Sequence, residues 1–164
     1  MDEPSWGEVD PHLLRRVVVV SPHFDDGVLG ASFLLARHPG SIVLTVFGGR
    51  PDAYPDEPSE WDAAGGFAKG DDVVGARREE DRHALAVLGA EPFWLEFVDN
   101  QYGDVRSHPR PQAVAPEVLA AIDRLDPSAV FLPMGLGHPD HVVTHDVGLL
   151  VREERPDVAW FCYQ

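Results

Sequence analysis

The sequence of 164 residues contains one cysteine, Cys162, and one lysine, Lys69. A single cysteine excludes an internal disulfide framework and any zinc site built from thiolates, so a metal ion would have to be held by His, Asp or Glu. Cationic residues are scarce, since 13 Lys and Arg stand against 28 Asp and Glu and give a formal net charge of −15. Such a surface repels phosphate backbones, and we therefore expect no nucleic-acid partner.

Long hydrophobic runs are also missing. The apolar runs at 17–20 and 43–47 are far too short to cross a bilayer, so we expect no membrane span. Residues 1–11 carry four acidic residues and no cationic region of the kind that opens a signal peptide. We expect a cytoplasmic protein, and the length predicts a single domain over residues 1–164. The oligomeric state is not indicated.

Short apolar, β-branched runs alternate with longer stretches of helical spacing. This alternation predicts an α/β fold with a Rossmann-like parallel sheet and helices on both faces. Pro116 and Pro139 suit the first turn of a helix, and Gly89 lies just past a helix end. The expected strands are 17–20, 42–47, 93–97, 129–132 and 158–163, and the expected helices are 28–37, 73–88, 116–125 and 139–154.

Two long stretches, 48–72 and 100–116, match neither a helix nor a strand and are expected to be loops. Each follows an expected strand, so both lie over the carboxyl edge of a parallel sheet, where ligands bind in open α/β folds. Trp61, Phe67 and Tyr102 are therefore candidates for lining a pocket. The alternative for each of them is an aromatic side chain that only packs a loop against the domain.

Two runs rich in histidine and aspartate follow the first and fourth expected strands, SPHFDD and HPDH. A sheet that winds outward and then reverses, with the order 3-2-1-4-5, makes these two strands neighbours and opens a crevice between their carboxyl ends. His23 and Asp26 would meet one or both of His138 and His141 there. Two histidines and a carboxylate are the ligand set of a catalytic zinc site, which activates water. Asp25, directed differently from Asp26, is then the candidate general base.

Each run alone also fits the start of a helix, because aspartate caps helices and complements the helix dipole. The placement of both runs at adjacent strand ends favours a site over this alternative. His145, one turn beyond the second run, is expected beside the site or at the surface. Four further histidines are expected at the surface: His12, His38, His83 and His108.

With these motifs the sequence resembles the PIG-L/LmbE-like zinc-dependent N-acetylglucosaminyl de-N-acetylases. That family carries a His-Pro-Asp-Asp-Glu motif after the first strand and a His-Pro-Asp-His motif later, and the resemblance covers most of the chain. His23, Asp25 and Asp26 fall on the first motif, and the HPDH run reproduces the second. Arg77, Glu80, Ala84 and the pair Leu88-Gly89 look like the family's Arg-x-x-Glu helix that ends in Leu-Gly.

The resemblance implies a role for each of these residues. It implies that Asp25 acts as the general base, and that His138, held by Asp140, stabilises the oxyanion or protonates the leaving amine. The implied Zn²⁺ ligands are His23, Asp26 and His141. The implied reaction removes an N-acetyl group from a small-molecule amino-sugar conjugate, and the loops look most like those of members acting on specialised-metabolite sugars such as antibiotics.

Substrate contacts are expected from Asp99, which matches an acidic position near the family's sugar site, and from Trp61 and Tyr102 in the loops. Arg77 fits either an anionic substrate group or a salt bridge. Arg78, followed by the acidic residues 79–81, is expected to form salt bridges on an exposed helix face.

The sequence departs from the family pattern at Phe24, where the family has proline, at Gly27, where it has glutamate, and in its shorter length. The chain ends within the fifth expected strand, as a natural short form or as a fragment whose remainder completes the pocket. Two alternatives stay open: a metal-containing binding domain with little or no activity, and a magnesium phosphoesterase. The histidines argue against the second, because magnesium prefers oxygen ligands.

Overall fold

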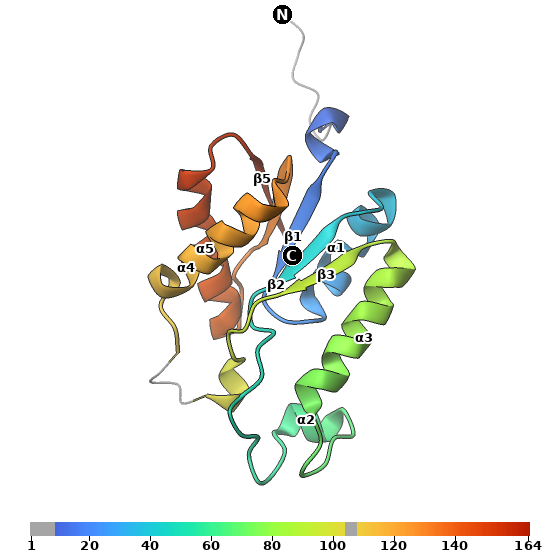
Figure 1. Cartoon of the computed structure of the whole chain (residues 1–164), viewed down its shortest axis with the longest axis vertical. Coiled ribbons are helices and arrows are strands. Elements are labelled where there is room, and N and C mark those ends of the chain that lie inside the picture. The colour runs from blue at the N-terminus through green and yellow to red at the C-terminus, as the bar shows by residue number, and fades with distance from the viewer. Residues whose placement is uncertain (1–8, 104–107) are drawn as a thin grey trace, which may run out of the picture.

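The computed structural model describes residues 9–103 and 108–164, which build a five-stranded sheet with helices around it (Figure 1). The strand order is β3-β2-β1-β4-β5, and every neighbouring pair is parallel. This confirms the predicted α/β fold and its strand order. The strands are β1 (Val17–Ser21), β2 (Ile42–Thr45), β3 (Glu91–Trp94), β4 (Ala129–Pro133) and β5 (Ala159–Tyr163).

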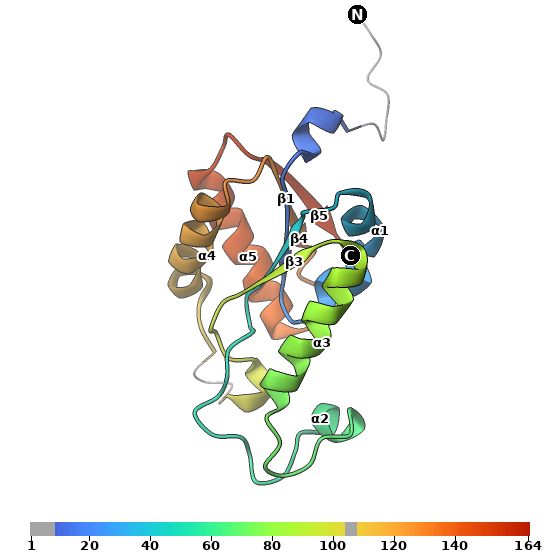
Figure 2. The ribbon, with the colours of Figure 1, turned by 45° about the vertical axis from the view of Figure 1, so that its right-hand side comes forward.

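Helices cover both faces of the sheet, with α1 and α3 on one side and α4 and α5 on the other (Figure 2). A hydrophobic core lies on each face of the sheet, and alternate residues of β1 point into the two cores. Val17 and Val19 pack against α1 and α3, and Val18 and Val20 pack against α4 and α5. A strand buried on both faces is apolar at every position, which explains the run at 17–20. The helices are α1 (Asp26–Arg37), α2 (Glu60–Ala64), α3 (Val73–Leu88), α4 (Pro111–Leu125) and α5 (Pro139–Glu154), with short 3-10 turns η1 (Pro11–Leu14) and η2 (Asn100–Tyr102). None of the helices described is long and apolar enough to span a membrane.

Several predicted boundaries were wrong. Helix α4 begins at Pro111, which takes the first-turn position expected for Pro116, and Pro116 lies inside the helix. The buried side chains of Val114 and Val118 continue the apolar stripe of α4 toward its start, so tertiary packing decides where the helix begins. Strand β3 is displaced toward the N-terminus relative to the expected 93–97, because its partner β2 pairs with it from Glu91 to Trp94.

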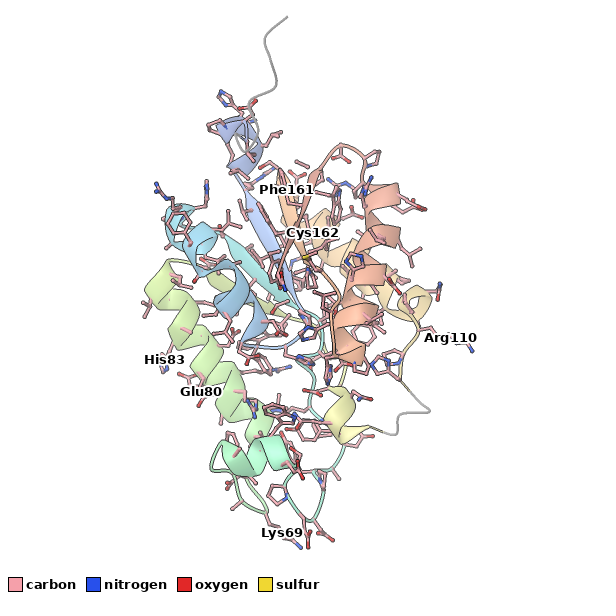
Figure 3. The ribbon with its side chains drawn as sticks, turned by 180° about the vertical axis from the view of Figure 1, so that it is seen from behind. Lys69, Glu80, His83, Arg110, Phe161 and Cys162 are labelled. Atoms are coloured by element: carbon pink, nitrogen blue, oxygen red, sulfur yellow. The ribbon has the colours of Figure 1, made fainter. Side chains whose placement is uncertain are left out.

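The expected loop 48–72 contains helix α2. Its N-cap is Ser59, whose Oγ accepts a hydrogen bond from the backbone N–H of Asp62 at 3.1 Å. A helix of five residues is too short to leave a periodic pattern in the sequence. Lys69 lies further along the same connection and pairs with Asp56 at 2.8 Å (Figure 3).

The predicted helix ends at Pro139 and Gly89 are confirmed. Pro139 lies in the first turn of α5, and Gly89 ends α3 in the left-handed conformation with a φ of 70°. Cys162 is exposed on β5 (Figure 3). The SPHFDD run connects β1 to α1, and the HPDH run opens α5 after β4. Because β1 pairs with β4, both runs lie at the reversal of strand order.

Candidate metal centre and active-site pocket

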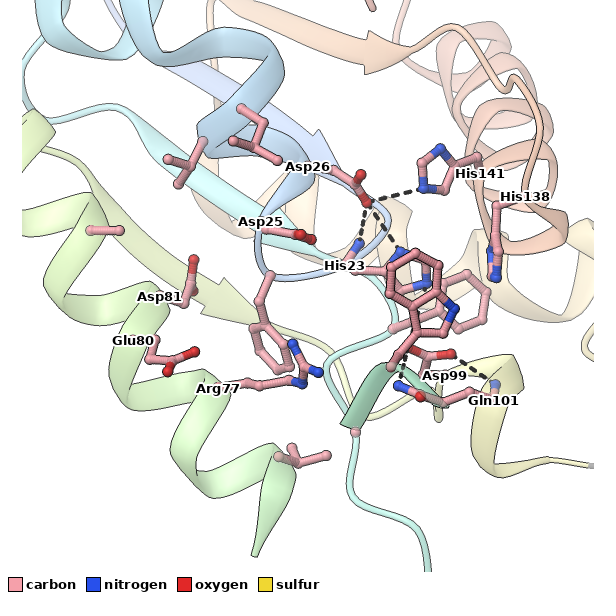
Figure 4. A pocket seen from close by; sticks show the side chains of 18 of the residues that line it. His23, Asp25, Asp26, Arg77, Glu80, Asp81, Asp99, Gln101, His138 and His141 are labelled. Carbon is pink, nitrogen blue, oxygen red and sulfur yellow. Dashed lines mark hydrogen bonds and ion pairs between the residues drawn. The ribbon is translucent and has the colours of Figure 1, made fainter. Parts of the chain in front are cut away.

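Asp26 joins the two motifs through one carboxylate oxygen (Figure 4). Its Oδ2 lies 3.1 Å from His23 Nδ1 and 3.1 Å from His141 Nε2, and it also accepts the backbone N–H of His23 at 3.0 Å. All three side chains are partly buried. The structure therefore brings together the three residues expected as zinc ligands, with two imidazole nitrogens beside one carboxylate.

The turn that carries His23 is fixed by Ser21 and Gly27. The Oγ of Ser21 donates a hydrogen bond to the carbonyl of His23 at 2.5 Å and accepts one from the backbone N–H of Gly27 at 2.8 Å. A Cβ atom on Gly27 would lie 2.9 Å from Cγ1 of Val43 and 3.2 Å from Ser21 Oγ. Tight packing thus accounts for glycine at the position where the family pattern has glutamate.

Asp140 is fully buried and ties three segments together. Its Oδ2 lies 2.9 Å from His23 Nε2 and accepts the backbone N–H of Asn100 at 3.1 Å, while its Oδ1 contacts Nε2 of His108. The ring of His108 also stacks on Phe47, with ring centroids 5.8 Å apart. The prediction that His108 is a surface residue was wrong, because these contacts come from distant parts of the chain and leave no local pattern.

These contacts control the charge of His23. Burial by itself lowers the pKa of His23, but hydrogen bonds with Asp140 and Asp26 and the nearby charge of Asp99 outweigh it and raise the pKa to about 10. Burial likewise opposes ionisation of Asp26 and Asp140, yet their bonds to His23 keep both carboxyl pKa values below the ordinary one. The centre therefore favours a positive charge among its carboxylates, which is what a divalent cation supplies.

His138 is the N-cap of α5, where its Nδ1 accepts the backbone N–H of Asp140 at 3.2 Å. The Asp140 carboxylate is 3.9 Å from the same nitrogen, so the backbone supplies the closer contact between the two residues. Because Nδ1 is an acceptor, the ring proton of neutral His138 lies on Nε2. Among the described residues, two groups have potential ligand atoms within 4.8 Å of one another: His23, His138 and His141, and His23, Asp99 and Asp140.

Asp25 and Asp99 flank the histidines. Asp25 is the N-cap residue of α1, but its exposed side chain makes no capping hydrogen bond and lines the pocket instead. Asp99 accepts the backbone N–H of Gln101 at 2.9 Å, and its Oδ2 lies 3.7 Å from His23 Nε2. His145, expected beside the site or at the surface, pairs through Nδ1 with the carbonyl oxygen of Pro133 at 2.8 Å.

The pocket is a cavity of about 500 Å³ bounded by the start of α1, by α2, by α3, by η2 and by the start of α5. Trp61, Arg77, Asp99 and Tyr102, all expected to contact substrate, line it. Phe67, the third loop aromatic considered for the pocket, does not line it, and the Arg77 guanidinium lies 5.5 Å from its ring centroid. Trp61 is 77% exposed. Asp62, which sequence reasoning missed, is 2% exposed and binds Nη2 of Arg77 at 3.1 Å and the hydroxyl of Tyr102 at 2.9 Å. One buried carboxylate thus positions two pocket residues.

Asp81 is not on an exposed helix face, contrary to the expectation for residues 79–81. It is 3% exposed, and its Oδ2 accepts a hydrogen bond from Nε1 of Trp94 at 2.7 Å. Burial and the charge of Asp25 raise the pKa of Asp81 to about 6. Arg78, by contrast, forms the expected type of salt bridge, with Glu96 at 2.8 Å, and also bonds the carbonyl of Gly48.

Comparisons with known proteins identify the family and the fold of the chain. The family model for PIG-L, GlcNAc-PI de-N-acetylase, matches residues 18–152. Comparison with curated protein sequences gives no match. The structure of the A40926 pseudoaglycone deacetylase Dbv21 is 30% identical with a TM-score of 0.78 and covers 91% of this chain. A triple mutant of the deacetylase Orf2 from the teicoplanin biosynthetic pathway is 33% identical, with a TM-score of 0.78 over 88% of this chain.

A third similar structure is a zinc-inhibited form of the teicoplanin deacetylase Orf2, which is 28% identical with a TM-score of 0.76 over 88% of this chain. The matched regions cover 64%, 62% and 65% of these three proteins, respectively. The chain therefore spans less than two thirds of the length of each of these relatives.

Proposed function

The chain belongs to the PIG-L family of GlcNAc-PI de-N-acetylases, and we propose on that basis that it is a zinc-dependent hydrolase that removes an N-acetyl group from an amino-sugar conjugate. The observation that carries the proposal is the contact of Asp26 Oδ2 with Nδ1 of His23 and Nε2 of His141 inside the pocket. Relatives with the same fold are described as a deacetylase of the A40926 pseudoaglycone and a deacetylase of the teicoplanin biosynthetic pathway.

The types of donor atom suit a zinc ion, and Asp26 contacts both His23 and His141 at 3.1 Å, although Asp26 is in neither of the two groups whose ligand atoms all lie within 4.8 Å of one another. Two imidazole nitrogens and a carboxylate oxygen form a common catalytic zinc set, and His23 also turns its second nitrogen to the Asp140 carboxylate, as metal-binding histidines usually do. We assign the ligand roles to His23, Asp26 and His141. When bound, the zinc ion supplies a Lewis acid that polarises the amide carbonyl and activates water.

Asp25 is the proposed general base. Its carboxylate is exposed to the pocket and is not used to cap α1, so it is free to accept the proton of the attacking water. It comes from the same turn as Asp26 but does not share the histidine contacts of Asp26. This separation gives one carboxylate for the metal and one for the proton.

His138 is the proposed donor to the reacting amide. With Nδ1 accepting the backbone N–H of Asp140, its Nε2–H can stabilise the developing oxyanion. The other expected role, proton donation to the leaving amine, requires a ring protonated at both nitrogens and therefore the loss of this contact. Asp140 holds His138 through the backbone and His23 through its carboxylate, so it aligns both rings.

We propose that the substrate is an N-acetylated amino sugar attached to a larger aglycone. Asp99, Arg77 and Tyr102 line the pocket beside the histidines, and Trp61 offers an exposed aromatic surface at the same cavity. Aromatic side chains at a cavity suit contact with sugar rings and apolar groups. The specialised-metabolite substrate class expected from the sequence matches the descriptions of the relatives.

The test combines metal analysis with an amine-release assay on N-acetylglucosamine conjugates. One zinc per chain with free amine released is expected, and His23→Ala should lose the zinc. Asp25→Asn should keep the zinc and lose about 10²–10⁴-fold in turnover, the usual contribution of a general base. Because one relative is described in a zinc-inhibited form, zinc must be titrated from zero to excess. Zinc retained by His23→Ala, or full activity of Asp25→Asn, would refute the assignment.

A further inference from the structure

Asp81 combines burial with a free hydrogen-bond acceptor. It is 3% exposed, yet it forms part of the pocket wall with Asp25 and Glu80. Its Oδ2 is bonded to Trp94, whereas Oδ1 is buried and has no hydrogen-bond partner among the residues that the structure describes. Buried polar atoms are nearly always hydrogen-bonded, so an unpaired carboxylate oxygen in a pocket wall marks a position for a donor from outside the chain.

The carboxyl group of Asp81 is held in one orientation. Its partner Trp94 packs beneath two guanidinium groups, those of Arg78 and Arg82, which lie 5.1 and 5.2 Å from its ring centroid. The ring of Phe24 packs edge-on against the Trp94 ring, with the two ring centroids 6.2 Å apart. Because the indole is fixed on several sides, the Asp81 carboxyl is directed from α3 toward the part of the pocket that contains Asp25 (Figure 4).

Within the described residues, Asp81 forms no salt bridge with a cation, and the neighbouring charge that acts on it in the pocket is that of another carboxylate, Asp25. A buried carboxylate without a cation costs stability, which asparagine at the same position would avoid while still accepting the Trp94 bond. Residues that carry such a cost are concentrated at functional sites.

The charge around Asp81 identifies the kind of donor. The wall beside it carries Asp25 and Glu80. The one guanidinium that lines the described pocket, that of Arg77, is paired through Nη2 with Asp62, while its buried Nε has no hydrogen-bond partner among the described residues. A phosphate or carboxylate of a substrate would be repelled here, whereas a hydroxyl group is uncharged and donates one hydrogen bond.

We propose that Asp81 is a specificity-determining residue whose Oδ1 accepts a hydrogen bond from a hydroxyl group of the substrate. The inference rests on the proposed deacetylase function and narrows its substrate class to uncharged, hydroxyl-rich amino-sugar conjugates. Sugar phosphates and acidic sugars are then poor substrates.

The test compares Asp81→Asn with wild type in the zinc-loaded full chain. Asparagine keeps the acceptor for Trp94 and replaces the free oxygen by an NH₂ donor. For methyl N-acetylglucosaminide, kcat/KM is expected to fall about 10- to 100-fold, the usual loss for a hydrogen bond to a charged group. The matched control is Glu79→Gln, which removes the same charge from an exposed position of α3 and should leave kcat/KM unchanged.

Mono-deoxy analogues of the sugar, each lacking one hydroxyl group, separate recognition from structural damage. For one analogue, kcat/KM of wild type should be lower than for the parent sugar by the same factor of about 10- to 100-fold. Asp81→Asn should have the same kcat/KM for that analogue as for the parent sugar. Equal losses of the variant on the parent sugar and on every analogue, or wild-type activity of the variant, would overturn the role of Asp81. Zinc content must equal that of wild type throughout.

The indole N–H resonance of Trp94 gives a readout that does not need turnover. Because this N–H is bonded to Asp81, binding of the parent sugar should shift the resonance saturably in wild type, and the critical deoxy analogue should not. A shift without amine release would refute the proposed reaction and support the binding role of Asp81. Amine release without any shift would support the reaction and overturn the inference.

Discussion

Nε2 of His23 lies 2.9 Å from Oδ2 of Asp140, although 117 positions separate the two residues in the sequence. The contact joins the turn after β1 to the start of α5 after β4, the two segments that meet at the reversal of strand order. Since Asp140 uses one imidazole nitrogen, the other, Nδ1, faces Asp26. The contact thus determines which nitrogen of His23 is available to a metal ion.

Replacing Asp140 by Asn should therefore weaken zinc binding about 10- to 100-fold, the usual effect of losing a carboxylate behind a metal-binding histidine. The measurement is zinc affinity by competition with a chelator. Asp146→Asn makes the same charge change at an exposed position of α5 and should leave the affinity unchanged. Equal affinities of Asp140→Asn and wild type would show that His23 needs no such support.

The sequence predicts the part of the site that lies within the two short motifs. His23 and Asp26 are close in sequence, as are His138 and His141. The strand order that joins the pairs is one of those compatible with alternating strands and helices, and the structure confirms it. The assignment of roles to these residues stays a prediction, as do the single domain, the cytoplasmic location and the absence of a nucleic-acid partner.

Other parts of the site were not predictable from local patterns. His108 contacts Asp140 and Phe47 across the fold, and Asp62 lies in a helix too short to show periodicity. Asp81 stands in a charged run, Arg77 to Arg82, that reads as a solvent-exposed helix face, and only the packing of Trp94 against α3 shows that it is buried. Tertiary contacts decide burial wherever the helix carries charge on several sides.

The tight packing around Gly27 predicts that the glutamate of the family pattern is not accepted here. Gly27→Ala should lower the free energy of unfolding by about 1–3 kcal/mol, because its Cβ would lie 2.9 Å from a buried valine, and Gly27→Glu should lower it at least as much. Chemical denaturation measures the effect. Gly103→Ala is the control, since its Cβ would meet nothing closer than 3.9 Å. A stabilised Gly27→Ala protein would contradict the packing argument.

The buried carboxylate of Asp62 predicts a loss of substrate affinity at a distance from the histidines. Asp62→Ala frees both Arg77 and Tyr102, so KM should rise about 10-fold while zinc content stays constant. The unfolding free energy should also fall by about 1–3 kcal/mol, because the variant leaves polar partners without their bond. Glu60→Ala on the exposed side of α2 is the control. A change in kcat alone would place Asp62 in the chemical step instead.

The pKa of Asp81 predicts a pH-dependent stability that is independent of activity. The folded protein raises this pKa from 3.8 to about 6, so folding favours the protonated carboxyl group. The stability that wild type has at low pH is therefore lost as the pH rises from about 4 to about 6, and the penalty stays constant above that range. Two pKa units correspond to about 3 kcal/mol, of which solvent access and relaxation leave about 1–3 kcal/mol.

Asp81→Asn cannot ionise and avoids this penalty. It should be more stable than wild type at about pH 8, and this advantage should shrink to about a third at about pH 4.5, where the native carboxyl group is mostly protonated but that of the unfolded chain is mostly ionised. Urea denaturation of the chelator-treated proteins at the two pH values measures the difference, and Glu79→Gln should show no such change because Glu79 is exposed. An equal difference in unfolding free energy between variant and wild type at both pH values would mean that ionisation of Asp81 does not destabilise the folded protein. A variant that is more stable at pH 8 yet a poorer enzyme cannot owe its lost activity to unfolding, so this result would leave recognition of the substrate as the reason for a charge at this position.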